Sequence, residues 1–211
     1  MKDKPPTIFV VDDDDAVRTS LRLLLKSVGL PVETFAAAQE FLAAFDAERA
    51  GCLVLDIRMP GMSGLELQQR MNDIHAIIPI VFITGHGDVP MAVEAMQHGA
   101  VDFIQKPFRD QDLIERINQA LEKDGDNRAG LKERDAIRRR IEQLTPRERE
   151  VLALVTQGKA NKVIALDLNV SQRTVEIHRA RVMEKMGASS LAHLVRMAIE
   201  ADGAAGAASP G

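Results

Sequence analysis

Short apolar runs alternate with longer segments of helical spacing through the first 123 residues. The runs have the length of buried strands and occupy residues 8–11, 31–35, 52–55, 80–83 and 101–104. Between them, apolar residues recur every three or four positions, as the 3.6-residue turn of a helix requires. Strands that alternate with helices in this way are typical of a parallel sheet covered on both faces. We therefore predict an α/β domain over residues 1–123, with a flavodoxin-like, doubly wound, five-stranded parallel sheet.

Residues 124–141 break this alternation, and residues 142–202 have helical spacing throughout. The first stretch is polar and begins with the turn-forming letters DGDN, so we predict a partly helical linker. In the second stretch, Thr145 and Glu148 form a capping box that marks the start of the first of four helices. We predict an all-α domain there, followed by a disordered tail of small residues over 203–211.

Composition and charge suggest that the two predicted domains have different partners. The 211 residues are 45% hydrophobic and 27% charged, which is a normal globular composition. Residues 1–123 hold 12 Lys/Arg and 19 Asp/Glu, a net charge of −7, whereas residues 124–211 hold 15 and 12, a net of +3. The basic half is consistent with nucleic acid as a partner, or with chance, because the excess is modest. A lone Cys52, the lack of a secretory signal and the lack of a long apolar stretch lead us to expect a cytoplasmic protein without a membrane partner.

Polar side chains follow four of the five predicted strands. Asp12 and Asp13 come after the first, Asp56 after the third, Thr84 after the fourth and Lys106 after the fifth. Because the carboxyl ends of parallel strands meet at one edge of a sheet, these side chains should gather there. Crowded carboxylates repel one another unless a cation lies among them, and their oxygens suit Mg²⁺. The pattern predicts a phosphorylation switch, in which a carboxylate attacks phosphorus and becomes an acyl phosphate.

Each member of this cluster has an expected role. Oxygen ligands for Mg²⁺ would come from the side chains of Asp13 and Asp56 and the backbone carbonyl of Arg58, with Asp12 holding a metal-bound water. Lys106 would supply a positive charge to the new phosphoryl group. Thr84 would donate its hydroxyl to a phosphoryl oxygen and so report that the group has arrived.

Each residue also has a simpler interpretation. Acids near a helix start are favourable there, and for Asp14 and Asp15 we prefer this capping role. Asp56 taken alone could cap a loop, Thr84 could satisfy a backbone group, and Lys106 could be a surface lysine. The functional hypothesis depends on their conjunction, because chance placement at the ends of four strands is improbable.

Residues 1–123 resemble a receiver domain of a bacterial two-component response regulator. The resemblance is carried by the letters VVDDDD (10–15), LDIRMPGMSGLEL (55–67) and FITGHGDVPMAVEAMQHGAVDFIQKPF (82–108), and the last of these points to the FixJ-like branch. It implies that Asp56 is the phosphorylated aspartate, that Asp12 and Asp13 are the acidic metal pair, and that Lys106 contacts the phosphoryl group. Thr84 and Phe103 would be the switch pair, in which the hydroxyl moves toward the phosphoryl group and the aromatic ring rotates inward.

The second half contains a helix, a three-residue turn and another helix, which is the helix-turn-helix arrangement. On the segment from 172 to 186, Val175, Val182 and Met186 share one arc and should face the core. The residues on the opposite face, free to meet base edges, are Arg173, Glu176, Ile177, Ala180, Arg181 and Glu184. The residues better placed for phosphates are Lys162, Thr174, Arg179 and Lys185. From the residues alone, a protein-binding helical module is about equally consistent with this pattern.

Residues 144–198 resemble the LuxR/NarL-type DNA-binding domain over nearly its full length. The motifs LTPREREVL, NKVIA and RTVEIHR carry the resemblance. It implies that the third helix approaches bases through residues 176, 177 and 180, and that the fourth helix pairs with its twin in a dimer. The dimer contacts implied are Leu191, Leu194 and Val195 in this domain, and Val89, Val93 and Met96 on the receiver.

Our main hypothesis is a phosphorylation-activated DNA-binding transcriptional regulator rather than an enzyme. A sensor histidine kinase would phosphorylate Asp56 with Mg²⁺, and a homodimer would bind a two-fold promoter site, with RNA polymerase as a further partner. An alternative is a phosphatase of the haloacid dehalogenase type, because the letters DDDAV (13–17) fit its D-x-D-x-[TV] motif. A third hypothesis is a DNA-binding protein whose receiver serves only as an interaction scaffold.

Overall fold

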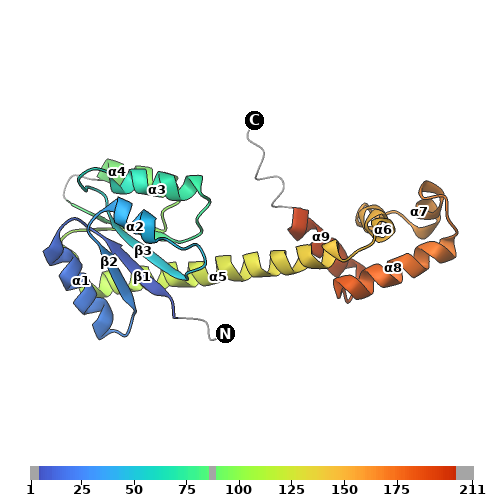
Figure 1. Ribbon diagram of the computed structural model, residues 1–211, viewed down its shortest axis with the longest axis horizontal. Helices are drawn as coiled ribbons and strands as arrows, with labels where there is room; N and C mark the ends of the chain where they lie inside the picture. Colours follow the sequence, from blue (N-terminus) through green and yellow to red (C-terminus); the bar gives the residue numbers. More distant parts are fainter. Residues whose placement is uncertain (1–4, 86–88, 203–211) are drawn as a thin grey trace. The chain divides into compact units, whose positions relative to one another are not determined.

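The computed structural model describes residues 5–85 and 89–202, which divide into two compact units, Met1–Arg128 and Ala129–Gly211 (Figure 1). The first unit is built on a five-stranded sheet of order β2-β1-β3-β4-β5, in which every neighbouring pair is parallel. Its strands are β1 (Thr7–Val11), β2 (Val32–Phe35), β3 (Gly51–Asp56), β4 (Ile80–Thr84) and β5 (Asp102–Gln105). The predicted doubly wound α/β fold is confirmed, with strand ends within one residue of the apolar runs.

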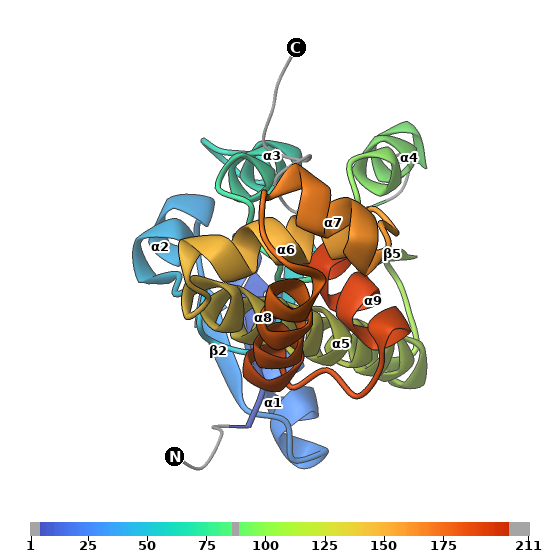
Figure 2. The same cartoon turned by 90° about the vertical axis from the view of Figure 1, so that its right-hand side faces the viewer.

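Helices cover both faces of this sheet (Figure 2). One face packs against α1 (Asp15–Ser27) and the first part of α5 (Asp110–Glu142), and the other against α2 (Ala38–Ala44), α3 (Gly64–Asp73) and α4 (Val89–Gln97). The alternation within β1 shows why both faces need cover. Ile8 and Val10 lie in the core on the α1 side, whereas Phe9 and Val11 lie in the core on the α3 side.

Helix α5 is longer than the sequence predicted. It runs without a break for 33 residues and includes the whole of residues 124–141, where we expected a linker that is only partly helical. Gly125 and Gly130 lie inside it, and each costs a helix about 1 kcal/mol relative to alanine. The prediction was wrong in this respect because local turn signals were outweighed by contacts with distant parts of the chain.

Two side chains make those contacts within the first unit. The Asp124 carboxylate is buried and accepts the backbone N–H of Gly51, the first residue of β3, at 2.9 Å. Arg128 binds Asp124 with its Nε at 2.9 Å and donates from its other nitrogens to the carbonyls of Ala47 and Arg49. This segment of α5 is therefore fastened to the loop between α2 and β3.

The second unit is helical, as predicted. It contains the end of α5 and α6 (Pro146–Thr156), α7 (Asn161–Asp167), α8 (Gln172–Met186) and α9 (Leu191–Asp202). The Thr145–Glu148 capping box is confirmed, as are the Ser171 cap of α8 and the left-handed Gly187 that ends it. No helix in the described part of the chain is both long and apolar enough to cross a lipid bilayer. The predicted tail, 203–211, lies outside the described residues.

Candidate functional site

Four strand ends bring the predicted polar residues to the carboxyl edge of the sheet. Asp12 directly follows β1, Asp56 ends β3, Thr84 ends β4, and Lys106 directly follows β5. The register places Val11 beside Leu55 and Thr84 beside Gln105, so these ends are level with one another.

Lys106 joins two buried carboxylates at this edge. Its Nζ lies 2.9 Å from Oδ2 of Asp12 and 2.8 Å from Oδ1 of Asp56. Asp12 is 1% exposed and Asp56 is 8% exposed, so neither carboxylate is solvated well by water. Two anions at such depth are stable only beside a cation, and Lys106 supplies it.

The surroundings affect the two partners of the Asp56–Lys106 pair differently. Burial raises the pKa of Asp56, although the hydrogen bond from Lys106 opposes that rise. Burial alone would lower the pKa of Lys106, but its hydrogen bonds to Asp56 and Asp12 outweigh burial and raise it. The lysine therefore remains a cation, and it lies beside an Asp56 carboxyl group that is poorly hydrated.

Backbone donors fix the orientation of both carboxylates. The N–H of Arg58 donates to Oδ2 of Asp56 at 2.7 Å, and the N–H of Asp14 donates to Oδ1 of Asp12 at 2.9 Å. Gly64 lies so close to the Asp56 carbonyl that any Cβ there would collide with it. Packing at the site therefore requires glycine at position 64, a point that the sequence motif alone did not explain.

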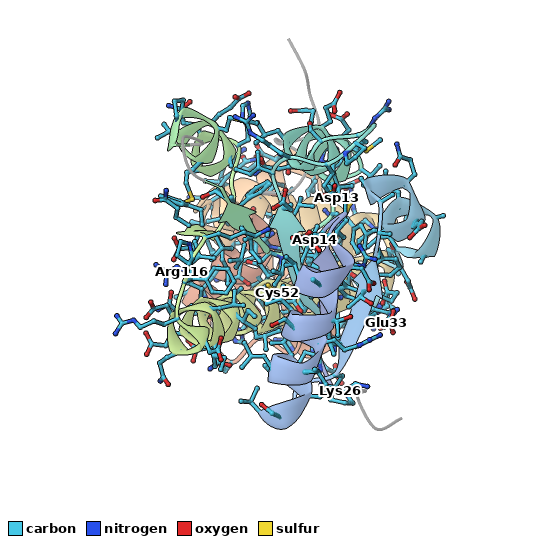
Figure 3. All side chains as sticks on the ribbon, turned by 90° about the vertical axis from the view of Figure 1, so that its left-hand side faces the viewer. Asp13, Asp14, Lys26, Glu33, Cys52 and Arg116 are labelled. Atoms are coloured by element: carbon cyan, nitrogen blue, oxygen red, sulfur yellow. The ribbon has the colours of Figure 1, made fainter. Side chains whose placement is uncertain are left out.

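Asp13 differs in exposure from the two carboxylates that bind Lys106. It is exposed and lines a shallow pocket with the loop after β3, which includes Arg58 and Met59. Figure 3 shows Asp13 and Asp14 at the start of α1. Among the described residues, no three His, Cys, Asp or Glu side chains converge as a metal-binding group. Mg²⁺ nevertheless needs only one or two carboxylates beside waters and phosphate oxygens, so this donor set fits it in kind.

The neighbouring acids take the capping roles we preferred for them. Asp14 is the N-cap of α1 and accepts the N–H of Ala16 at 2.8 Å. Asp15 lies in the first turn and pairs with Arg18 at 2.9 Å. Arg18 also donates to the Asp12 carbonyl at 2.7 Å, a contact that the motif did not reveal.

The two residues of the predicted switch pair lie on adjacent strands. Thr84 is buried, and its hydroxyl makes a long hydrogen bond of 3.5 Å to the Ile104 carbonyl of β5. Phe103 is half-buried and packs at the margin of the core on the α3 side. The Lys106–Pro107 peptide bond is cis.

The helix-turn-helix presents the predicted face to solvent. Val175, Val182 and Met186 are buried in the core of the second unit, as expected from their shared arc. The side chains on the other face of α8 that reach solvent are Arg173, Glu176, Ile177, Ala180, Arg181 and Glu184. Lys162 is exposed at the start of α7. This unit therefore offers a solvent-accessible helix with the side chains available for base contacts.

Three of the residues expected to contact phosphates make contacts inside the second unit. Lys185 pairs with the buried Glu148 at 2.7 Å, so its charge is largely neutralised within the fold. Arg179 donates to Asn161 at 3.0 Å, and the Thr174 hydroxyl lies 2.8 Å from that of Ser171. Lys185 is consequently a structural residue here, because a phosphate would have to compete with a buried carboxylate.

The expected dimer contacts are only partly accessible. Val93 and Met96 on α4 and Leu191 on α9 are 49%, 39% and 42% exposed. Leu194 is instead fully buried in the core of its own unit, so we remove it from the predicted dimer surface. Val195 is half-buried, and the side chain of Val89 lies outside what the structure describes.

An acidic site at the carboxyl edge of a doubly wound sheet, followed by a helix-turn-helix, defines a class of regulatory protein. The family of response regulator receiver domains matches residues 8–118, and the luxR family of bacterial regulatory proteins matches residues 142–198. The chain belongs to the response regulators that join a receiver to a luxR-family domain. It is a DNA-binding, two-component regulator of transcription that depends on phosphorylation.

Similar proteins agree with this assignment over nearly the whole chain. The transcriptional regulatory protein FixJ of Rhizobium meliloti (strain 1021) is 51% identical over 92% of this chain and 95% of its own length. The response regulator protein TodT of Pseudomonas putida is 44% identical over 93% of this chain and 87% of its own. The structure of response regulator StyR is 48% identical, with a TM-score of 0.81 over 92% of this chain and 98% of that one.

Proposed function

We propose that Asp56 accepts a phosphoryl group from the phosphohistidine of a sensor histidine kinase, and that this drives dimerisation and promoter binding. The observation that carries the proposal is the joining of Asp56 and Asp12 by Lys106 at the carboxyl edge of the sheet. An Asp56 oxygen forms the new bond to phosphorus while the phosphorus–nitrogen bond to histidine breaks, and the electron pair stays on the imidazole nitrogen. Positioning and charge neutralisation supply most of the catalysis in such a transfer.

The residues present would also hold Mg²⁺. Its ligands would be Asp13, Asp56 and the Arg58 carbonyl, with Asp12 holding a metal-bound water. When bound, the ion neutralises charge on the phosphoryl oxygens. Lys106 is anchored between Asp12 and Asp56, within reach of any group carried by the Asp56 carboxylate.

Thr84 and Phe103 would convert the modification into a change of surface. Among the residues that the structure describes, the partner of the Thr84 hydroxyl is the Ile104 carbonyl at 3.5 Å, a long bond, so little free energy is needed to redirect the hydroxyl toward a phosphoryl oxygen. The ring of Phe103, which is half-buried beside the core, would then rotate inward. Phosphorylation would shift a population toward an active state that is already accessible.

The active state would dimerise and bind a two-fold promoter site. Apolar side chains exposed on α4, Val93 and Met96, would contribute on the receiver, and Leu191 with Val195 on α9 would contribute in the second unit. The exposed face of α8 would enter the major groove. RNA polymerase is the expected further partner of a regulator bound at a promoter.

The site assignment is tested by Asp56→Asn. We expect acetyl phosphate with Mg²⁺ to add one phosphoryl group to the wild-type chain, measured by intact mass, and to add none to the variant. Asp73→Asn is the matched control, because Asp73 is an exposed aspartate at the end of α3. An equal mass increase in Asp56→Asn would contradict the assignment.

The phosphatase alternative gains no support from the same residues. Its motif would require the carboxylates of Asp13 and Asp15 to act together on a substrate. Asp15 is instead exposed in the first turn of α1 and paired with Arg18, and Asp13 is exposed beside the β3–α3 loop. Neither carboxylate has the buried, cation-paired position that Asp56 has.

A further inference from the structure

We propose that Arg116 of α5 is a positioning residue that holds β5 in its resting arrangement around Phe103. The inference rests on the proposed function, because it concerns the switch that Thr84 and Phe103 would form. Arg116 stood out neither by motif nor by spacing in the sequence. It is singled out by its contacts with the strand that carries Phe103.

The first step concerns the outer edge of the sheet, which β5 forms. An edge strand has backbone groups that no further strand can satisfy. At Phe103, both the backbone N–H and the backbone carbonyl find hydrogen-bond partners in side chains. Oδ1 of Asp102 accepts the Phe103 N–H at 2.8 Å, and Nε of Arg116 donates to the Phe103 carbonyl at 3.2 Å. The backbone of the switch residue is therefore held from the side opposite to β4.

The second step is that Arg116 is itself anchored. Its Nε lies 3.0 Å from Oδ2 of Asp102, and its Nη1 donates to the Asp112 carbonyl one turn earlier in α5 at 3.0 Å. Figure 3 shows the labelled Arg116 between α5 and the edge of the sheet. The Arg116 and Asp102 side chains are each about one-third exposed, so water weakens the ion pair without replacing the backbone contacts.

The third step compares the contacts made to two consecutive carbonyls of β5. Thr84 contacts the Ile104 carbonyl from β4 at 3.5 Å, and Arg116 contacts the Phe103 carbonyl from α5 at 3.2 Å. Phosphorylation would remove the Thr84 contact, because the hydroxyl turns toward the phosphoryl group. The Arg116 contact would remain and would oppose movement of β5. Arg116 thus favours the resting state of the switch.

Removing this contact should raise the active population of the unphosphorylated protein. In Arg116→Gln we expect the ratio of active to resting protein to rise roughly tenfold, because the resting state loses hydrogen bonds from a charged donor. Asp102→Asn keeps the acceptor for the Phe103 N–H but weakens the pair with Arg116, so its effect should be smaller. Arg109→Gln is the matched control, because the contact of Arg109 with Asp112 lies on the surface of α5 and its side chain is 87% exposed.

The measurement is fluorine NMR of the full chain labelled with 4-fluorophenylalanine, in which Phe103 is assigned among seven phenylalanines by the loss of its signal in Phe103→Leu. The Phe103 signal of unphosphorylated Arg116→Gln should move toward its position in wild type treated with acetyl phosphate and Mg²⁺. A residue that only stabilised the fold would lower the melting temperature without moving this signal.

Two results would overturn the inference. One is a Phe103 signal in Arg116→Gln that coincides with that of wild type or of Arg109→Gln, and the other is a shift away from the phosphorylated position. If the wild-type chain itself takes up no phosphoryl group on Asp56, the proposed function fails instead. If it does, and its Phe103 signal responds, only the role of Arg116 is at stake.

Discussion

At the scale of single residues, Glu148 shows how one side chain can serve several parts of a fold. It is 2% exposed, accepts the Thr145 N–H at 2.9 Å as part of the capping box, and pairs with Lys185 Nζ at 2.7 Å. Lys185 also donates to the Gln143 carbonyl at 3.3 Å. Glu148 and Lys185 together therefore join the start of α6 and the end of α8 to the chain that leaves α5.

The Glu148 carboxylate should make the second unit sensitive to acid. The hydrogen bond from Lys185 is the largest of the effects that lower the pKa of Glu148 from 4.5 to about 2. Because this pKa is lower in the folded state, the carboxylate stabilises the fold above pH 4.5, and that stability is lost as pH falls from 4.5 toward 2. Glu148→Gln should lower the melting temperature at pH 7 and flatten its decline in this window.

Calorimetry of the full chain between about pH 2 and pH 7 measures this effect. Glu150→Gln is the control, because Glu150 lies on the same helix in an exposed pair with Arg147. A melting profile for Glu148→Gln that runs parallel to wild type across the window would show that the Lys185 pair does not carry the acid sensitivity.

Most of the site could be predicted from residues at strand ends, whereas its neighbours could not. Asp12, Asp56, Thr84 and Lys106 each follow an apolar run, and parallel strands bring such positions together. Arg116 has no comparable signal, because an arginine on a charged helix usually belongs to a solvated face. Its contact with Phe103 depends on how α5 packs against the edge of the sheet, which is set by the tertiary structure.

At the scale of elements, α5 is the helix whose extent depends most on distant contacts. The substitution Asp124→Ala would leave the Gly51 N–H and the Arg128 guanidinium without their buried acceptor. Removing one partner of a buried pair costs about 3 kcal/mol, so we expect a loss of this order in the free energy of unfolding of the first unit. Urea unfolding of the full chain, followed by circular dichroism, measures it.

Glu122→Ala provides the comparison for Asp124→Ala, because Glu122 is exposed on the same helix two residues earlier. A loss no larger in Asp124→Ala than in Glu122→Ala would mean that the fastening of α5 to the α2–β3 loop adds no stability.

Helix and strand positions were otherwise predicted well, for identifiable reasons. Continuous apolar runs indicated β1, β3 and β4, which are buried on both faces of the sheet. Caps indicated the starts of α6 and α8, where Thr145 and Ser171 accept backbone N–H groups. The segment after Lys123 was misjudged because DGDN carries turn signals, while Asp124 stabilises the helix through a residue 73 positions away.

At the scale of the whole molecule, charge is divided unevenly along the chain. Residues 1–123 contain 19 acidic and 12 basic residues, an excess of negative charge that does not favour contact with nucleic acid. Residues 124–211 contain 15 basic and 12 acidic residues, and several of these cations are paired within the second unit. Lys185 with Glu148 and Lys159 with Asp167 are two such pairs, both at 2.7 Å.

The cations of the second unit that remain exposed should therefore divide between two tasks in DNA binding. Arg181 lies on the exposed face of α8, where it can reach base edges, and Lys162 lies at the start of α7, where it can reach a phosphate. Arg181→Ala should change the preferred sequence, with a cost of about 1–3 kcal/mol at the position it reads. Lys162→Ala should weaken binding to all sequences similarly. It should also reduce the slope of log affinity against log salt concentration by about one.

Selection of duplexes with a randomised core by the acetyl-phosphate-treated full chain, at several salt concentrations, separates these effects. Arg70→Ala serves as the control, because Arg70 lies on α3 of the receiver. A uniform loss across all duplexes in both Arg181→Ala and Lys162→Ala would contradict the division between base contacts and phosphate contacts. A changed preference in Lys162→Ala alone would reverse it, placing the start of α7 rather than the face of α8 against the bases.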